Sequence, residues 1–331
     1  MRIAVLGAGA WGSALAISLS TRHQICLWSK DPNHAIQMNS QRINQSFLPG
    51  YPLPEALRIT SSLNEALGAA DFALIVVPIA GLRETLRAMA ASKIKMPIIW
   101  GCKGFESDTT LLPHQVVEAE YSAILPYCCG VLSGPSFAEE VAQGLPTALT
   151  LASKDVDFSS RIAAVLHSPT LRIYTSQDVI GVETGGAIKN VITIAAGISD
   201  GIGFGHNARA ALITRGLMEI TRLGLALGGS MKTFMGLAGV GDLILTSTGD
   251  LSRNRKVGLM LAEGKSLNVI LSELGHVAEG VHTAQSVLRL GDRLKIEMPI
   301  TQAVCSILHE GVSARTAVEV LLNREQKTEI Y

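Results

Sequence analysis

The chain has 331 residues, which is long enough for two domains of ordinary size. Its 28 Lys and Arg residues balance 28 Asp and Glu residues, so no overall charge attracts nucleic acid or an anionic membrane. The five cysteines form no C-x-x-C pair, which argues against a disulfide framework or zinc site and fits a reducing cytosol. No apolar run reaches the roughly 20 residues of a spanning helix. We therefore expect a cytoplasmic protein with no nucleic-acid partner, no metal site and no stable membrane insertion.

The first half of the chain alternates short β-like runs with helical stretches. Strands are expected at Ile3–Leu6, Gln24–Trp28, Ala73–Val77, Pro97–Trp100, Gly130–Leu132 and Ala148–Ala152. Helices are expected at Gly12–Ser20 and Leu82–Ala91, while the Pro-containing segment Phe47–Pro54 is interpreted as a loop. Near-continuous apolar strands with helices on both faces are typical of a buried parallel sheet.

From Gly185 onward helical spacing dominates and strand signals nearly vanish. Helices are expected at Arg209–Leu227, Asn254–Glu263, Ser266–Leu274, Thr283–Leu290 and Thr316–Arg324. The predicted fold class is α/β, with a doubly wound Rossmann-type domain over residues 1–182 and an all-α substrate domain over residues 183–331. Because no low-complexity linker separates them, we expect the domains to pack closely and the site to lie between them.

The segment Gly7–Gly12 reads GAGAWG and lies between a predicted strand and a predicted helix. Gly7 permits the tight turn, Gly9 lets the backbone approach a pyrophosphate, and Gly12 lets the helix pack on the strand. The start of the helix then offers free N–H groups and a partial positive charge to the phosphates. A G-x-G-x-x-G motif in this context predicts a dinucleotide site, above all for NAD(P).

The end of the second strand bears on which dinucleotide binds. An NAD-specific site usually has an acid here to accept a hydrogen bond from the ribose 2′-OH. This chain has Ser29 and Lys30 first, which leaves room for the 2′-phosphate of NADP, although Asp31 can serve as the ribose acid. The pattern favours NADP slightly, and Lys30 is equally consistent with a solvated turn lysine.

Two later strands of the predicted sheet end in polar residues. Lys103 follows the strand at Pro97–Trp100 and lies between two glycines, where it can point at a substrate or be a surface loop lysine. After Leu132, Ser136 and Glu139 have the spacing of a capping box that starts a helix. The start of that helix can also contact an anion or a cofactor.

Lys189 is the only ionisable side chain between Glu183 and Asp200. The surrounding helix is apolar nearly all round, so it should be buried. Burial lowers the pKa of an ammonium toward the range useful for proton transfer. The alternative is a lysine that reaches water beyond the start of the helix; we favour a functional lysine.

A second polar cluster occurs further along the chain. Asp242 and Thr246 are four residues apart and would share a helix face. Arg253 can grip a phosphate with its planar guanidinium, and Asn254 can add a neutral donor. Taken alone, residues 252–256 are more often a solvated basic turn.

Together these segments resemble the NAD(P)-dependent glycerol-3-phosphate dehydrogenases of the bacterial type, over essentially the whole chain. The matching motifs are Gly7–Gly12, Gly101–Gly104, Ser133–Glu139, Gly186–Asn190, Ser199–Asn207, Gly239–Thr246, Ser252–Asn254 and Val277–Gly280. The resemblance implies reversible NAD(P)H-dependent reduction of dihydroxyacetone phosphate to sn-glycerol 3-phosphate, which supplies phospholipid synthesis. It leaves the oligomeric state open, a homodimer included.

The resemblance also implies a role for individual residues. Lys189 becomes the proton donor and acceptor, with Lys103 and Asp242 beside the reacting carbon. The implied substrate contacts are Lys103, Gly134, Ser136, Lys189, Asp242, Ser252, Arg253 and Asn254, the last three at the phosphate end. The implied cofactor contacts are Gly7, Gly9, Ala10, Trp11, Gly12, Lys30, Lys103, Ala138, Arg253, Val277 and Glu279. Two departures stand out: Ala10 replaces a frequent hydroxyl residue, and Cys102 replaces the usual Thr.

Two other interpretations compete with this one. A 3-hydroxyacid or phosphogluconate-type dehydrogenase has a similar layout but acts on carboxylates, and would not need the cluster at residues 252–256 for a terminal phosphate. A non-enzymatic NAD(P)-sensing module would need the turn at Gly7–Gly12 but would gain nothing from a lone lysine in an apolar helix.

Overall fold

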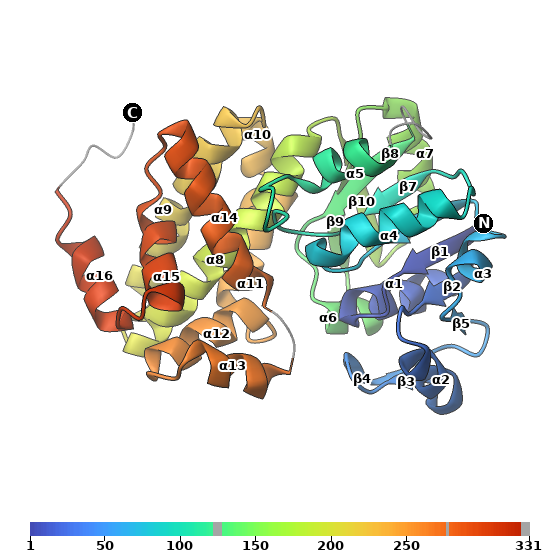
Figure 1. Ribbon diagram of the computed structural model, residues 1–331, viewed down its shortest axis with the longest axis horizontal. Coiled ribbons are helices and arrows are strands. Elements are labelled where there is room, and N and C mark those ends of the chain that lie inside the picture. The colour runs from blue at the N-terminus through green and yellow to red at the C-terminus, as the bar shows by residue number, and fades with distance from the viewer. Residues whose placement is uncertain (122–127, 276–277, 326–331) are drawn as a thin grey trace.

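The computed structural model describes residues 1–121, 128–275 and 278–325. Figure 1 shows a half built on a β-sheet beside a half built from helices α8 to α16. The strands are β1 (Arg2–Leu6), β2 (Gln24–Trp28), β3 (Ile43–Asn44), β4 (Leu48–Pro52), β5 (Arg58–Thr60), β6 (Phe72–Ile75), β7 (Ile98–Trp100), β8 (Cys129–Ser133), β9 (Thr147–Ala152) and β10 (Leu171–Ser176). The helices of the first half are α1 (Ala10–Ser20), α2 (Pro32–Gln41), α3 (Leu63–Leu67), α4 (Ile79–Ala91), α5 (Pro113–Tyr121), α6 (Ala138–Ala142) and α7 (Val156–Leu166).

The main sheet has eight strands in the order β10-β9-β8-β7-β6-β1-β2-β5. From β1 the chain builds outward through β2 to β5, and then returns to add β6 on the other side of β1. Ligands of such sheets bind at this switch point, outside the carboxyl ends of the strands. The doubly wound prediction is confirmed. Neighbouring strands are parallel except β8 and β9, which are antiparallel, so the expectation of a wholly parallel sheet is wrong at that pair.

Helices cover both faces of the sheet, as predicted. Alternate residues of β1 enter different cores, because side chains alternate between the two faces of a strand. Ile3 and Val5 pack in one cluster with side chains of α1, α2 and α7. Ala4 and Leu6 pack in another cluster with side chains of α3, α4 and α5.

Four strands were not expected from the sequence: β3, β4, β5 and β10. The segment Phe47–Pro54, interpreted as a loop, contains β4, which pairs with β3 in a separate two-stranded sheet. Strands β5 and β10 form the two edges of the main sheet. An edge strand needs little apolar sequence, and polar residues such as Arg58 and Arg172 mask the pattern.

From Val179 on, the described residues form helices and turns without a strand, as expected. The elements are α8 (Val179–Ile202), α9 (Gly205–Ala226), α10 (Met231–Phe234), the π-helical turn η1 (Leu237–Gly241), α11 (Asp242–Thr248), α12 (Arg253–Ala262), α13 (Leu267–Leu274), α14 (Glu279–Leu294), α15 (Pro299–His309) and α16 (Ala314–Leu322). The predicted domain border at residue 182 falls in the first turn of α8 and stays a prediction.

Helix α8 is the centre of the helical half. It buries 20 of its 24 residues, and α9, α11, α12 and α14 pack around it. By length and composition α8 is long and apolar enough to cross a membrane, although its apolar run is interrupted by polar residues and did not stand out in the sequence. Of its most apolar window, 94% is buried inside the structure, as expected for the core helix of a folded domain.

Candidate active site

The turn at Gly7–Gly12 has the geometry expected of a pyrophosphate-binding turn. Gly7 has a φ of +120°, and a Cβ there would lie 2.9 Å from the backbone of Val76. A Cβ at Gly12 would lie 1.9 Å from the carbonyl oxygen of Gly7. A Cβ at Gly9 would meet nothing within 4 Å, so this backbone is open to a ligand. Each glycine therefore has the structural reason that the sequence predicted, and the residues fit a dinucleotide.

Other predicted cofactor residues lie around this turn. Ala10, Trp11 and Ala138 pack in one small cluster, although Ala138 comes from the start of α6. A Cβ at Gly101 would lie 3.4 Å from Nε1 of Trp11, which places the segment that carries Lys103 against the same turn.

The end of β2 shows how both candidate ribose residues are held. Nζ of the exposed Lys30 lies 2.7 and 2.8 Å from the two carboxylate oxygens of Glu84 on α4. Asp31 is the N-cap of α2, where its side chain accepts a hydrogen bond from the backbone N–H of Asn33 at 2.9 Å. Asp31 thus has a structural role, and Lys30 remains at the surface beside α4.

Lys189, Lys103 and Asp242 meet in one ionic cluster, although they come from three different segments. Nζ of Lys189 on α8 lies 2.5 Å from Oδ1 of Asp242, the first residue of α11. Nζ of Lys103, which follows β7, lies 2.7 Å from Oδ2 of the same carboxylate. Asp242 is 1% exposed and Lys189 is 6% exposed. The structure therefore brings together the three residues predicted to surround the reacting carbon.

Burial and charge set the protonation of this cluster. The pKa of Lys189 is lowered to about 8, because burial and the nearby charge of Lys103 outweigh the opposing effect of Asp242. Burial would raise the pKa of Asp242, but the two ammonium groups outweigh it and hold that pKa below its ordinary value. Asp242 is therefore ionised at neutral pH, and Lys189 changes its protonation state close to neutral pH. The arrangement matches the prediction of a buried lysine suited to proton transfer.

Thr246 completes the hold on Lys189. As predicted from its spacing, it lies one helical turn after Asp242 on α11. Its hydroxyl accepts a hydrogen bond from Nζ of Lys189 at 2.8 Å and donates to the backbone oxygen of Asp242 at 2.6 Å. The spacing indicated the shared face, but not that Thr246 contacts Lys189.

Gly186 lies against Ser133 and the stem of Lys103. A Cβ at Gly186 would lie 2.9 Å from Oγ of Ser133 and 3.6 Å from Cγ of Lys103. The glycine therefore makes room for Ser133, and the stem of Lys103 runs at ordinary contact distance from it. The hydroxyl of Ser133 is buried and has no hydrogen-bond partner among the described residues.

The predicted phosphate residues gather at the start of α12. Ser252 is its N-cap and accepts a hydrogen bond from the N–H of Arg255 at 3.2 Å. Asn254 is buried, and its Oδ1 accepts from the N–H of Gly280 at 3.1 Å. Arg253 is exposed, and no described residue hydrogen-bonds to its guanidinium. Arg253 is thus the cation of this cluster that remains available to a ligand.

Glu279 lies within electrostatic reach of Arg253 and of both lysines, Lys103 and Lys189. Burial raises its pKa, while the charges of Lys103, Arg253 and Lys189 act in the opposite direction. Nδ2 of Asn190 lies 3.5 Å from its Oε2. Val277, the other predicted cofactor residue of this segment, lies outside the described residues.

The loop after β8 departs from its predicted capping box. Gly134 has a φ of +138°. The hydroxyl of Ser136 donates to the carbonyl oxygen of Gly134 at 3.1 Å instead of capping α6. Helix α6 begins at Ala138 with Phe137 as its N-cap, so a Ser136–Glu139 capping box is wrong. The left-handed glycine turns Ser136 away from the first turn of the helix.

Two further groups lie near the site: Glu183 had no signal in the sequence, and Cys102 stood out only as a departure from the usual Thr. Glu183 is 3% exposed, and its Oε1 accepts from Nε1 of Trp100 at 2.7 Å and from the N–H of His114 at 2.8 Å. Three segments far apart in sequence meet there, which no local pattern reveals. Cys102 is buried with its thiol toward the carbonyl oxygen of Ile75, and burial raises its pKa. Its thiol therefore points to the sheet instead of the lysines.

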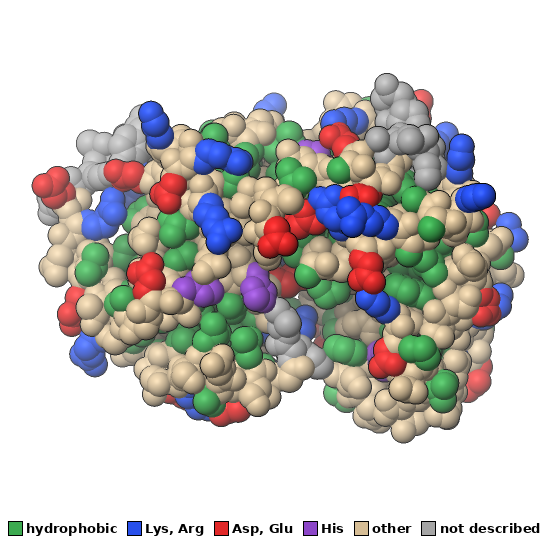
Figure 2. Space-filling view, in the orientation of Figure 1, with side chains coloured by type: hydrophobic (Ala, Val, Ile, Leu, Met, Phe, Trp, Pro, Cys, Tyr) green, Lys and Arg blue, Asp and Glu red, His purple; other side chains and the backbone are tan. Residues whose placement is uncertain are grey.

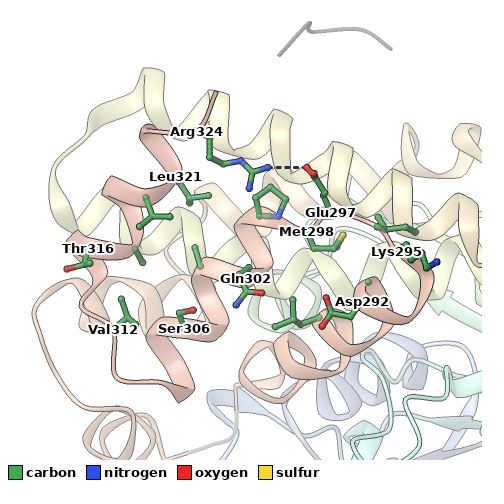
Figure 3. A pocket seen from close by; sticks show the side chains of 17 residues that line it. Asp292, Lys295, Glu297, Met298, Gln302, Ser306, Val312, Thr316, Leu321 and Arg324 are labelled. Atoms are coloured by element: carbon green, nitrogen blue, oxygen red, sulfur yellow. Dashed lines mark hydrogen bonds and ion pairs between the residues drawn. The ribbon is translucent and has the colours of Figure 1, made fainter. Parts of the chain in front are cut away.

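The surface adds two observations. Figure 2 shows acidic and basic side chains interspersed over one face, with a notch between the two halves at its lower edge. A cavity of about 730 Å³ lies elsewhere, between α14, α15 and α16 (Figure 3), and no predicted site residue lines it. Arg324 and Glu297, which both line this cavity, form an exposed ion pair at 3.1 Å. We place the chemistry at the lysine cluster, where burial and charge act together.

Comparison with known proteins agrees with this arrangement along the whole chain. Residues 2–159 match the family model of the NAD-dependent glycerol-3-phosphate dehydrogenase N-terminus, and residues 178–319 match that of its C-terminus. An NAD(P)+-dependent glycerol-3-phosphate dehydrogenase of Nitrosospira multiformis is 66% identical, with 100% of both chains covered. That of Nitrosomonas eutropha is 59% identical, with 99% of each covered.

A solved structure gives the same result in three dimensions. The glycerol-3-phosphate dehydrogenase of Coxiella burnetii superimposes with a TM-score of 0.93 at 43% identity, covering 98% of this chain and 99% of that one. Two family models together span most of the chain, and full-length relatives far exceed the similarity that a shared fold requires. The chain therefore belongs to the family of NAD-dependent glycerol-3-phosphate dehydrogenases.

Proposed function

We propose that this chain catalyses the reversible NAD(P)H-dependent reduction of dihydroxyacetone phosphate to sn-glycerol 3-phosphate. The observation that carries the proposal is the buried Lys189, whose pKa is lowered to about 8, hydrogen-bonded to Asp242 at 2.5 Å. A group with such a pKa can both donate and accept a proton near neutral pH. The names of the relatives supply the reaction, and this cluster supplies the residues that can perform it.

The residues of the Gly7–Gly12 turn would hold the cofactor, which when bound supplies the hydride. Negative charge then grows on the carbonyl oxygen of the substrate. Lys189 donates its proton to that oxygen, and Lys103 adds a second positive charge beside it. The two carboxylate oxygens of Asp242 each bind one ammonium group, Lys189 at 2.5 Å and Lys103 at 2.7 Å. The carboxylate thus holds the two ammonium groups side by side. In the oxidation direction, neutral Lys189 accepts the hydroxyl proton.

Arg253 would bind the phosphate of the substrate. Its guanidinium is exposed at the start of α12, where helix N–H groups also favour an anion. Asn254 is braced by its hydrogen bond to Gly280 and fixes this first turn. A phosphate held at this end positions the carbonyl carbon at Lys189 through binding energy remote from the reaction. Gly134 and Ser136 would line the same substrate site.

Several attributes of the whole chain belong to this proposal. We place the enzyme in the cytoplasm without stable membrane insertion, supported by free cysteines and the burial of α8. We set the domain border near residue 182, supported by the change from strands to helices at α8. The family resemblance leaves the oligomeric state open, and a homodimer is the assembly to test.

Steady-state kinetics with dihydroxyacetone phosphate and each reduced cofactor test the proposal. We expect oxidation of NADH, NADPH or both that depends on dihydroxyacetone phosphate, monitored at the nicotinamide absorbance. The matched control substrates are dihydroxyacetone, which lacks the phosphate, and a carboxylate ketone such as a 3-oxoacid. Turnover of the carboxylate ketone without turnover of dihydroxyacetone phosphate would overturn the reading and favour the 3-hydroxyacid dehydrogenase class.

A further inference from the structure

A buried chain of hydrogen bonds links the Gly-rich turn to the end of β2. Its centre is the fully buried Asn44, which lies on the short strand β3. Nδ2 of Asn44 donates to the carbonyl oxygen of Ala8 at 2.9 Å and to Oγ of Ser13 at 2.8 Å. Oδ1 of Asn44 accepts from the backbone N–H of Phe47 at 3.2 Å and lies 3.0 Å from Nε2 of His34. The small β3–β4 sheet, which the sequence did not predict, thus braces the dinucleotide turn.

The partners of Asn44 decide the direction of every hydrogen bond in this chain. The carbonyl oxygen of Ala8 can only accept and the N–H of Phe47 can only donate, so the amide of Asn44 has one orientation. Its oxygen therefore faces His34, and Nε2 of His34 must carry a proton. The ring of His34 packs edge-on against Phe47 with centroids 5.3 Å apart, which holds its orientation.

The last bond of the chain sets the proton of Ser29. Nδ1 of His34 lies 3.2 Å from Oγ of Ser29. In the neutral imidazole, a proton on Nε2 leaves Nδ1 as an acceptor, so the hydroxyl of Ser29 must donate to it. The proton of Ser29 then faces His34, and the lone pairs of Oγ remain for another donor.

Ser29 directly follows β2, twenty residues after Gly9, the place where an acid accepts a hydrogen bond from the ribose 2′-OH in many dinucleotide sites. We propose that Asn44 and His34 are positioning residues that fix the Ser29 hydroxyl as an uncharged acceptor for that 2′-OH. The inference rests on the dinucleotide site proposed above.

This arrangement assigns the two cofactors to two different side chains. A ribose 2′-OH can donate to Ser29, whereas a 2′-phosphate presents acceptor oxygens and gains nothing from an acceptor. The 2′-phosphate depends instead on Lys30, which must share its ammonium with Glu84. Because Ser29 carries no charge, it does not repel a 2′-phosphate as a carboxylate would. The chain can therefore take both NADH and NADPH.

Titration calorimetry on the full-length enzyme tests this assignment with ligands that cannot react. The two probes are ADP-ribose, which carries a 2′-OH, and 2′-phospho-ADP-ribose. The variants are Ser29→Ala, which removes the acceptor, and His34→Leu, which removes the group that holds its proton. Ser40→Ala is the matched control, because the exposed Ser40 of α2 donates only to the carbonyl oxygen of Gln37 within its own helix.

We expect Ser29→Ala to weaken ADP-ribose by about 3- to 10-fold, the range of one ordinary hydrogen bond, and to leave 2′-phospho-ADP-ribose unchanged. We expect His34→Leu to tighten 2′-phospho-ADP-ribose relative to ADP-ribose, because the freed hydroxyl can then donate to phosphate. Ser40→Ala should change neither affinity.

Equal weakening of both probes by Ser29→Ala, or no weakening, would overturn the proposal while leaving the dinucleotide site intact. An unchanged ratio of the two affinities in a folded His34→Leu variant would do the same. Should that variant lose its native circular dichroism, Ser29→Ala alone decides the matter. If neither probe binds the wild-type enzyme, the dinucleotide site itself is wrong and the proposed function fails with it.

Discussion

Lys189 is the residue on which the proposed reaction depends most. We expect Lys189→Ala to lower kcat by at least about 10²-fold, the lower range of general acid–base effects, while NADH still binds. Steady-state kinetics and NADH titration of the same preparation measure the two quantities. Lys95→Ala is the control, since Lys95 is an exposed lysine in the loop between α4 and β7 and is not a predicted site residue. Full turnover in Lys189→Ala would remove this residue from the mechanism.

The pKa of Lys189 gives the two reaction directions opposite pH dependence. Reduction needs the protonated lysine as donor, so its kcat should fall as pH rises through about 8. Oxidation needs the neutral lysine as acceptor, so its kcat should rise over the same interval. Profiles of kcat recorded in both directions from the same buffer series check this. Two profiles that change in the same sense near pH 8 would contradict the assignment.

Thr246 offers a finer test at the same site. Thr246→Val keeps the shape of the side chain but removes the hydroxyl that accepts from Nζ of Lys189 at 2.8 Å. A hydrogen bond to a charged group stabilises that charge by roughly 1.5–3 kcal/mol. We therefore expect the pKa seen in the kcat profile to fall by about one unit or more. Thr248→Val is the control, because the exposed Thr248 bonds only to Ile244 within the same helix. Equal shifts in both variants would show that Thr246 acts without contacting Lys189.

At the scale of elements, the packing of α12 on α8 sets the distance between Lys189 and the proposed phosphate-binding residues of α12. Both helices use glycine where they cross, and a Cβ at Gly258 would lie 2.1 Å from the carbonyl oxygen of Ile194. Gly258→Ala should push α12, which carries Arg253 and Asn254, away from Lys189. We expect a clearly higher KM for dihydroxyacetone phosphate, a smaller rise in the KM for NADH because Arg253 is also an implied cofactor contact, and a loss of roughly 1–3 kcal/mol in the free energy of unfolding.

The control for Gly258→Ala is Glu263→Ala, at the exposed C-terminal end of the same helix. Urea unfolding and the two KM values are measured for both variants. A KM for NADH that rises as much as that for dihydroxyacetone phosphate would show that α12 does not position the phosphate end separately.

At the scale of the whole molecule, Glu183 ties the two halves together. From α8 it accepts hydrogen bonds from Trp100 at the end of β7 and from His114 on α5. Glu183→Ala leaves these buried donors without an acceptor, at about 1–3 kcal/mol each. We expect the free energy of unfolding to fall by about 3 kcal/mol or more. Glu118→Ala, at an exposed position of α5, should change it little.

The tryptophans let this test follow one half separately. All three, Trp11, Trp28 and Trp100, lie in the sheet-based half, so tryptophan fluorescence follows that half, while far-UV circular dichroism follows the helices of both halves. In the wild type the two transitions should coincide, and in Glu183→Ala they should separate. Separate transitions already in the wild type would show that Glu183 does not couple the halves.

Much of the architecture could be predicted because its cause is local. The turn at Gly7–Gly12 has glycines whose backbone geometry depends on immediate neighbours, and the apolar sequence around Lys189 specifies its burial. Edge strands β5 and β10 and the antiparallel pairing of β8 with β9 could not be predicted, because the pairing of a strand depends on distant strands. The partners of Lys189 are 53 and 57 positions away, and only the spacing of Asp242 and Thr246 hinted at them.

The remaining parts of the site depend on contacts that no sequence window contains. Asn44 lies just before the segment interpreted as a loop, and its role appears only when Ala8 and His34 are folded against it. Glu183 resembles any acid at the start of a helix until Trp100 and His114 surround it. Ser136 had a correct local signature and still does not cap, because the left-handed Gly134 redirects it.

Helix α8 also determines how the protein exchanges its amide hydrogens with solvent. With 20 of 24 residues buried, its backbone N–H groups have no local route to water, so deuterium can enter the middle of this helix only when the helical half opens as a unit. The slowest-exchanging peptide of the enzyme should therefore be the one that contains Lys189. Its deuterium uptake gives a direct measure of global stability, taken at the residue proposed to transfer the proton.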